Sequence, residues 1–290
     1  MNPKVLIIPD VHGRSFWKEP VKDIIENYND VHVVFLGDYT DPYLNEIDSV
    51  TGEAITTSQG YDSLLDVIKV KNENPDRVTL LLGNHDLGYV SNYIHNERRR
   101  KDFKNEASIR NTILGNINLF DLAYEVTVNE KKFLLTHSGV TTKWVTACET
   151  LLKDYDESFT FSVDNVNRIL HTQFGTPNSY NLNLALSYVS YYRGGDDNCS
   201  SMVWTDVREH LEPDSTNWAD EHGYIQVFGH TQLSKSGVSI EGKSFCLDVR
   251  KAFYIDVEGN IRDYTTEEID VVNISEDERK YLYNKRFFGI

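Results

Sequence analysis

The stretch from residue 78 to residue 86 reads VTLLLGNHD, and its plan decides the fold. An apolar run ends in a glycine and then in three polar side chains of the kind that bind metal ions. Four further stretches follow the same plan and read VLIIPDVH from Val5, VHVVFLGD from Val31, FLLTH from Phe133 and IQVFGH from Ile225. Apolar runs of this length predict strands that are buried on both faces. Ligands of α/β sheets bind beyond the carboxyl ends of the strands, so the five polar clusters predict one shared site.

The segments between these runs complete an α/β pattern. Helical spacing of apolar residues predicts helices over 19–28 and 61–72, and a further helix within 97–115. Two hairpins are expected, one joining 124–128 to 132–135 and the other joining 252–257 to 260–264. Residues 141–201 are rich in Asn, Ser and Tyr, and we interpret them as a cap or insertion beside the site. We expect a single domain over residues 1–290, with 275–290 packed on its outside.

The composition narrows the class of protein. The chain of 290 residues carries a formal net charge of −16, which repels a polyanion, so bulk binding of nucleic acid is not expected. A small phosphate substrate is still compatible with this charge, because bound metal reverses its sign locally. The three cysteines are far apart, and no apolar run has the length of a signal peptide core or a membrane helix. These features predict a cytoplasmic protein that has no disulfide framework and no membrane contact.

The polar clusters supply ligands for two divalent metal ions. The candidate ligands are Asp10, His12, Asp38, Asn84, His137 and His230. Carboxylate oxygens and imidazole nitrogens around a shared bridging oxygen are typical of a dinuclear centre. Asp10 and His12 are two residues apart and can reach one ion, Asp38 can bridge, and the last three can complete the second ion. A role as turn formers and caps would explain Asp, Asn and Gly, but it gives no reason for a histidine at four of the five clusters.

The order of these motifs resembles the calcineurin-like metallophosphoesterase superfamily. The motifs are D-x-H-G from Asp10, G-D-x-x-D from Gly37, G-N-H-D from Gly83, H-S-G from His137 and G-H-T from Gly229. Two more segments, VWTD from Val203 and FCLD from Phe245, are similar to the bacterial and phage phosphoprotein-phosphatase-like branch. The resemblance implies a metallophosphoesterase fold, which is a four-layer αββα sandwich of two mixed β-sheets flanked by helices. It also implies a metal-dependent hydrolase of phosphoric esters.

The resemblance implies a mechanism as well. A hydroxide that bridges the two ions would attack phosphorus in line, and His85 would protonate the leaving oxygen as the general acid. Asp41, at the end of the G-D-x-x-D motif, would orient the His85 ring, with Asp86 as the alternative partner. We expect two manganese ions, with iron, zinc or nickel as alternatives.

Two departures from the family pattern bear on the substrate. Gln232 stands where many phosphodiesterases of the superfamily have a second metal-binding histidine, which favours a phosphomonoester. Pro42 stands where the phosphatase branch has an arginine that grips the substrate phosphate, so another cation is needed. We predict that Arg193, which precedes two glycines, takes this role, because glycines allow a close approach and a guanidinium can bind phosphate at two points.

Several alternatives stay open. Arg208 and Arg14 are weaker candidates for the phosphate grip, and the basic run at 98–101 is interpreted as a solvated helix face. The substrate is a phosphorylated small molecule, a nucleotide or a phosphoprotein. Hydrolysis of a nucleotide or dinucleoside polyphosphate is the first alternative function. A non-catalytic binding scaffold with the same fold is the second, although none of the six ligand positions is degraded.

Overall fold

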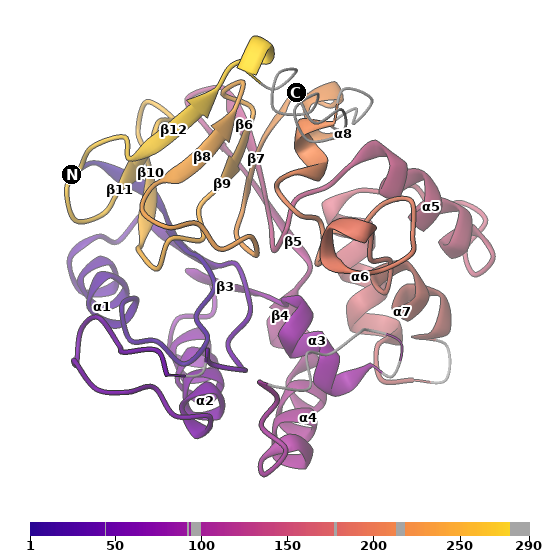
Figure 1. The fold of residues 1–290 in the computed structure, drawn as a ribbon, viewed down its shortest axis with the longest axis horizontal. Helices are drawn as coiled ribbons and strands as arrows, with labels where there is room; N and C mark the ends of the chain where they lie inside the picture. Colours follow the sequence, from indigo (N-terminus) through magenta and orange to yellow (C-terminus); the bar gives the residue numbers. More distant parts are fainter. Residues whose placement is uncertain (44, 92, 94–99, 177–178, 213–217, 279–290) are drawn as a thin grey trace.

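Two mixed β-sheets of six strands each form the centre of the protein, and helices flank them (Figure 1). This architecture confirms the predicted α/β sandwich. The computed structural model describes residues 1–43, 45–91, 93, 100–176, 179–212 and 218–278. The first sheet has the order β11 (Ile261–Asp263), β10 (Phe253–Asp256), β1 (Pro3–Ile8), β2 (His32–Phe35), β3 (Val78–Leu81), β4 (Phe120–Asp121). The second has the order β12 (Val271–Ile274), β8 (Gly237–Ile240), β9 (Ser244–Cys246), β7 (Tyr224–Phe228), β6 (Lys131–Thr136), β5 (Ala123–Val128).

The five predicted strands are β1, β2, β3, β6 and β7, and all are present. Strands β1, β2 and β3 are parallel neighbours, as are β6 and β7. Parallel strands end at the same edge of a sheet, and this arrangement gathers the polar clusters that follow them. The fold therefore turns five separate sequence motifs into one local site.

Alternation along the strands explains why they are apolar throughout. Val5 and Ile7 of β1 point into the layer between the two sheets, where they meet Phe133 and Leu135 of β6. Leu6, on the other face of β1, belongs to a second core beneath the helices. Both faces of the strand are thus buried, as the continuous apolar run predicted.

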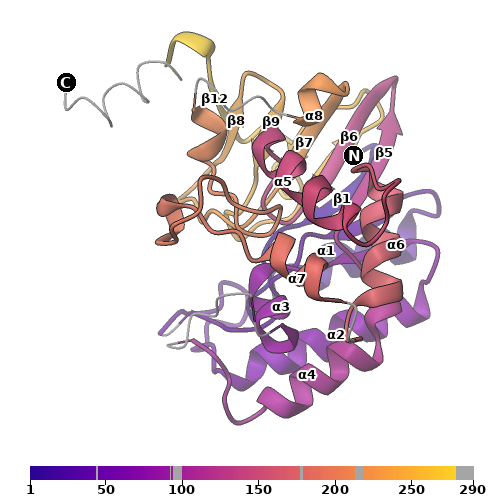
Figure 2. The ribbon, with the colours of Figure 1, turned by 90° about the vertical axis from the view of Figure 1, so that its right-hand side faces the viewer.

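Helices cover the outer face of the first sheet. They are α1 (Lys18–Asn27), α2 (Ser58–Glu73) and α4 (Glu106–Gly115), and they correspond to the three predicted helices. Val21 of α1 and Val67 of α2 enter the same core as Val33 of β2. In both views α2 and α4 lie at the bottom of the molecule, and β8, β9 and β12 lie at the top (Figures 1 and 2).

Both predicted hairpins form. Strands β5 and β6 pair in antiparallel fashion with Val128 opposite Lys131. Asn129 and Glu130 between them both have positive φ, 48° and 66°, as the two-residue turn that suits a twisted hairpin requires. Strands β10 and β11 also pair in antiparallel fashion.

Residues 141–201 contain helices that the sequence did not reveal. They are α5 (Thr142–Lys153), α6 (Val163–Gln173), α7 (Tyr180–Leu186) and the short 3₁₀ turn η3 (Tyr191–Arg193). Thr141 and Ser162 cap α5 and α6, because each hydroxyl accepts a hydrogen bond from the backbone N–H three residues later. Figure 1 shows α5, α6 and α7 grouped at the right of the sheets. A role for this group as a cap stays a prediction.

The remaining elements are short. They are α3 (Asn84–Val90), η1 (Ile117–Leu119), η4 (Glu209–Leu211) and α8 (Trp218–Glu221). The segment 275–290 was expected to pack on the outside, and its described part, 275–278, is exposed while 279–290 lie outside the described residues. All three cysteines are buried and free. Within the described ranges, no helix is both long and apolar enough to cross a membrane.

Candidate active site

The structure brings all six predicted metal ligands together where the strands end. Each lies in the loop or helix start after β1, β2, β3, β6 or β7, and each is buried. Asp38 is central, because its carboxylate belongs to two groups of potential ligand atoms. One group contains His12, and the other contains His137 and His230; the atoms in each group lie within 4.8 Å of one another. A shared carboxylate between two groups is the arrangement that a bridged pair of ions needs.

The first group is formed by His12, Asp38 and His85, and Asp10 lies beside it. The Nδ1–H of His12 donates a hydrogen bond of 2.7 Å to the carbonyl oxygen of Thr40. This contact fixes the ring and puts the lone pair on Nε2. That nitrogen lies 3.4 Å from Oδ2 of Asp38 and 4.0 Å from Oδ2 of Asp10.

The second group is built in the same way around His137. Its Nδ1–H donates a hydrogen bond of 2.8 Å to the carbonyl oxygen of Leu36. Its Nε2 then lies 3.0 Å from Oδ1 of Asn84, 3.2 Å from Nδ1 of His230 and 3.5 Å from Oδ2 of Asp38. Ligands that bind one ion at about 2.0–2.2 Å are separated from each other by roughly 3 Å, so the donor set fits a divalent cation.

The backbone of the site is strained. His12, Asp38, Asp41 and His230 have φ values of 45°, 53°, 56° and 63°. Residues other than glycine in this left-handed region cost about 1–3 kcal/mol each, and such residues cluster at functional sites. The strained turns at the ends of the strands aim these side chains toward one point.

Two glycines give the carboxylates room. A Cβ atom on Gly83 would lie 2.1 Å from Oδ1 of Asp38, and one on Gly229 would lie 2.1 Å from Oδ1 of Asp10. No real Cβ atom approaches an oxygen so closely. The glycines of the G-N-H-D and G-H-T motifs are therefore needed because a metal-binding carboxylate from another loop packs directly on them.

We expect Gly83→Ala to weaken metal binding by roughly 10- to 100-fold, the range found when support of a ligand is lost. Gly83 has a φ of −95°, so the added methyl group acts by displacing Asp38, whose carboxylate oxygen and backbone nitrogen it would meet at 2.1 Å and 2.6 Å. Titration of the metal-free protein with manganese measures the effect. Gly115→Ala, on an exposed part of α4 with no atom within 4 Å of its Cβ, is the matched control. Equal affinities in the two variants would contradict the packing argument.

Burial tunes the ionisation of the ligands. It lowers the pKa of His12 well below the ordinary value, and the charge of Arg100 adds to this shift. It also lowers the pKa of His230, with a further contribution from the charge of Arg193. Both rings are therefore neutral near neutral pH, which is the form that binds a metal ion. Burial raises the pKa of Asp10, so a cation at this position would offset the cost of an ionised buried carboxylate.

His85 follows the ligand Asn84 and lies at the edge of the same site. Its Nδ1 is 2.9 Å from Oδ2 of Asp41, and its backbone N–H donates to Oδ1 of Asp38 at 2.9 Å. The Tyr89 hydroxyl donates to the other oxygen of Asp41. Burial alone would lower the pKa of His85, but the charge of Asp38 and the hydrogen bond to Asp41 outweigh it and raise the pKa.

Asp86, the alternative partner of His85, has a different place. Its carboxylate accepts hydrogen bonds from the backbone N–H groups of Asp38 at 2.8 Å, Tyr39 at 3.0 Å and Gly83 at 3.1 Å. Asp86 therefore joins the loop after β2 to the start of α3. Its contact with Gly83 also explains why a helix begins at Asn84, which the sequence did not predict.

A cavity of about 230 Å³ opens over the site. It is lined by His12, Asp38, Tyr43, Asn84, His85, Arg100, Arg193, Trp204 and His230. Arg193 thus lines the cavity, and its Nε lies 3.0 Å from Oδ2 of Asp206. Its Nη2 donates to the Thr231 hydroxyl at 2.9 Å. Of the two weaker candidates, Arg208 pairs with the same Asp206 and Arg14 pairs with Glu46, and neither lines the cavity.

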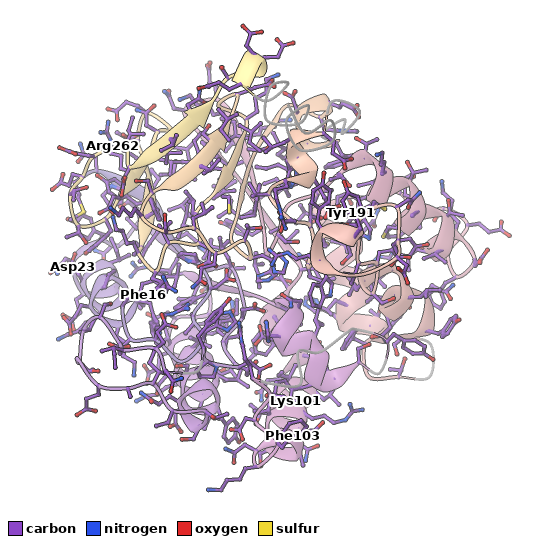
Figure 3. The ribbon with its side chains drawn as sticks, viewed as in Figure 1. Phe16, Asp23, Lys101, Phe103, Tyr191 and Arg262 are labelled. Carbon is purple, nitrogen blue, oxygen red and sulfur yellow. The ribbon has the colours of Figure 1, made fainter. Side chains whose placement is uncertain are left out.

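The interpretation of residues 98–101 as a solvated helix face is wrong for the part that the structure describes. Arg98 and Arg99 lie outside the described residues. Arg100 is only 7% exposed and Lys101 forms an ion pair with Glu106, and neither residue is helical. Figure 3 labels Lys101 near the lower end of α3. Charge alone suggested solvent exposure, but Arg100 is buried and lines the cavity of the site.

Sequence reasoning missed three residues of the cavity wall, which are Tyr43, Arg100 and Trp204. Tyr43 follows the G-D-x-x-D motif and Pro42, and Trp204 lies in the segment VWTD, so proximity to a motif could have indicated both. No local pattern distinguishes Arg100 from its basic neighbours.

The chain matches the model of a known protein family. Residues 3–234 match the family model of the calcineurin-like phosphoesterases. A search of curated protein sequences gives no significant match.

Several solved structures share the fold. The cold-active protein-tyrosine phosphatase of a psychrophilic Shewanella species has 14% sequence identity and a TM-score of 0.54, and the match covers 91% of this chain and 80% of that one. Another structure of a cold-active protein tyrosine phosphatase has 13% identity and a TM-score of 0.54, covering 93% and 81%. A protein serine/threonine phosphatase from Saccharomyces cerevisiae has 16% identity, covers 88% and 73%, and has a TM-score of 0.47. At these identities the first two show a common fold.

Proposed function

The chain belongs to the calcineurin-like phosphoesterase family, a family of metal-dependent hydrolases, and from this premise we propose that it hydrolyses phosphomonoesters with His85 as the proton donor. The observation that carries the proposal is the His85–Asp41 pair beside the clustered ligands. The ring is held through Nδ1 at 2.9 Å from Asp41, and the residue lines the cavity above Asp38 and Asn84.

Six residues would hold two divalent ions, which we propose to be manganese, with iron, zinc or nickel as alternatives. Asp10 and His12 would belong to one ion, Asn84, His137 and His230 to the other, and Asp38 to both. Such ions supply positive charge for the phosphate oxygens and make a water molecule acidic enough to act as a nucleophile near neutral pH. They would bind a dianion even though the whole chain carries a net charge of −16.

His85 would give its proton to the oxygen of the leaving alcohol. The Asp41 carboxylate holds the proton on Nδ1 and keeps Nε2 directed away from itself, into the cavity that His85 lines. Because its pKa is raised in the metal-free chain, His85 is more readily protonated than an ordinary buried histidine. Tyr89 fixes the other Asp41 oxygen, so the pair is positioned before substrate arrives.

Arg193 would contact the phosphate from the side of His230. Its Nη2 lies 3.3 Å from the His230 carbonyl oxygen, and the Asp206 and Thr231 contacts restrain the rest of its guanidinium. A planar guanidinium that is already restrained loses less entropy when it binds an anion.

Gln232 is exposed, whereas His230 just before it is buried among the candidate ligands, which supports a site with one histidine from this loop. We propose a monoester carried by a phosphorylated small molecule, a nucleotide or a phosphoprotein. Because two structures with this fold are named protein tyrosine phosphatases, a phosphotyrosine peptide belongs among the substrates tested.

We expect the manganese-loaded protein to cleave p-nitrophenyl phosphate faster than bis(p-nitrophenyl) phosphate. Both substrates release the same phenolate, so the ratio of their kcat/KM values reports the preference for a monoester. Phosphotyrosine and phosphoserine peptides, nucleoside monophosphates and a dinucleoside tetraphosphate extend the panel. A diester preference of about tenfold or more, which corresponds to about 1.4 kcal/mol, would contradict the monoester proposal. Absence of turnover on every substrate would favour a binding scaffold.

A further inference from the structure

Arg100 has a position that neither the family motifs nor the composition predicts. It is a buried arginine with 7% exposure, and its guanidinium reaches the cavity that contains the candidate ligands. Its Nη2 lies 3.2 Å from Nε2 of His85 and 3.3 Å from Nε2 of His12. The end of the side chain is therefore located between the proposed proton donor and a proposed metal ligand.

The guanidinium is held firmly in this place. Its Nε donates a hydrogen bond of 3.2 Å to the carbonyl oxygen of Asp41, which is the residue that orients His85. Its central carbon lies 3.6 Å from the centre of the Tyr43 ring, a close cation–π contact. Contacts on the Nε edge and on one face leave the orientation of the Nη2 end well defined.

The charge of Arg100 acts directly on the site. A fixed positive charge in the cavity attracts an anion, and a guanidinium offers parallel N–H groups that match two oxygens of a phosphate. A phosphoryl group that touches both the His85 side and the His12 side of the cavity would meet this charge.

We propose that Arg100 is a substrate-binding residue that holds the non-bridging oxygens of the phosphoryl group. The inference rests on the proposed phosphoesterase function, and it adds a second arginine to the one at position 193. By holding two oxygens of the phosphoryl group, Arg100 directs the leaving oxygen toward His85. A monoester dianion has three non-bridging oxygens that share two negative charges, whereas a diester has two that share one, so a cation at this position favours monoesters.

The test uses binding of inorganic phosphate to the manganese-loaded protein, measured by calorimetry. Arg100→Met is expected to weaken phosphate binding by roughly 10- to 100-fold, the value of a charge-assisted hydrogen-bonded contact. Arg100→Lys is expected to recover only part of the loss, since an ammonium cannot make the planar two-point contact. The monoester-to-diester ratio of kcat/KM should fall in parallel.

The matched control is Arg110→Met. Arg110 is a partly buried arginine whose Nη1 donates to the carbonyl oxygens of Tyr89 and Val90, and it does not line the cavity. Its variant should bind phosphate like the wild type. Wild-type phosphate affinity in Arg100→Met would overturn the proposal, and so would loss of manganese from that variant, which would make Arg100 a support for His12. Failure of the wild type to hydrolyse any ester would overturn the proposed function instead, because the binding measurement does not depend on turnover.

Discussion

Replacing His85 with asparagine is expected to lower kcat by about 10²- to 10⁴-fold while the manganese content stays unchanged. Asparagine is compatible with the loop, but its side chain has no acidic proton to give to the leaving oxygen at the position of Nε2. The backbone N–H of residue 85, which donates to Asp38, is retained in the variant, so the ligand stays in place. Activity on a series of aryl phosphates and the metal content of the same samples measure both parts of the prediction.

The loss should depend on the leaving group. An alcohol with a low pKa leaves as an anion and needs little protonation, so His85→Asn should impair p-nitrophenyl phosphate less than an alkyl phosphate. His171→Asn is the matched control, because His171 also pairs with an aspartate, Asp121 at 3.2 Å, but lies outside the cavity. An empty metal site in His85→Asn, or an equal loss for every leaving group, would show that His85 is not the proton donor.

Asp38→Asn is expected to have the largest effect on the metal centre. Its carboxylate lies 3.4 Å from Nε2 of His12 and 3.5 Å from Nε2 of His137, so it joins the two groups of ligands. An amide keeps the shape but removes the negative charge that both ions would share. We expect the metal content to fall from two ions per chain toward zero. The value of kcat/KM should fall by about 10³-fold or more, which corresponds to about 4 kcal/mol.

Asp48→Asn provides the comparison for this variant. Asp48 is also a buried aspartate that accepts backbone hydrogen bonds, from Ser15 and Thr51, but it does not line the cavity. It should retain two ions per chain. If Asp38→Asn also retains two ions, Asp38 does not bridge them.

The sequence predicted the parts of the fold that depend on local pattern. Strand β3 and the cluster after it could be identified because an apolar run and a polar ending are both visible within nine residues. The hairpin at Asn129 and Glu130 was predictable for the same reason, since two residues separate two paired runs. Helices α5 to α7 were not, because Asn, Ser and Tyr obscure their apolar positions and tertiary packing of residues such as Trp144 and Leu182 stabilises them.

In the site, too, the sequence predicted the residues that belong to local motifs but not those that long-range contacts bring in. Motif spacing was enough to gather Asp10, His12 and Asp38 as neighbours, because parallel strands bring their ends to one edge. Arg100 could not be found in this way. Its place depends on a long-range contact with Tyr43, and a run of basic residues in an acidic chain gives no sign of which one turns inward. The sequence predicts Arg193 as the substitute for the arginine that Pro42 replaces, and among the described residues both Arg193 and Arg100 line the cavity.

Anomalous diffraction from crystals of the manganese-loaded protein tests whether the site holds two bridged ions. We predict two manganese peaks per chain, about 3.5–4 Å apart, at the carboxyl ends of β1, β2, β3, β6 and β7. Asp38 should contact both ions, and the other five ligands should be divided between them. A single peak, or two peaks that do not share Asp38, would contradict a dinuclear centre bridged by Asp38.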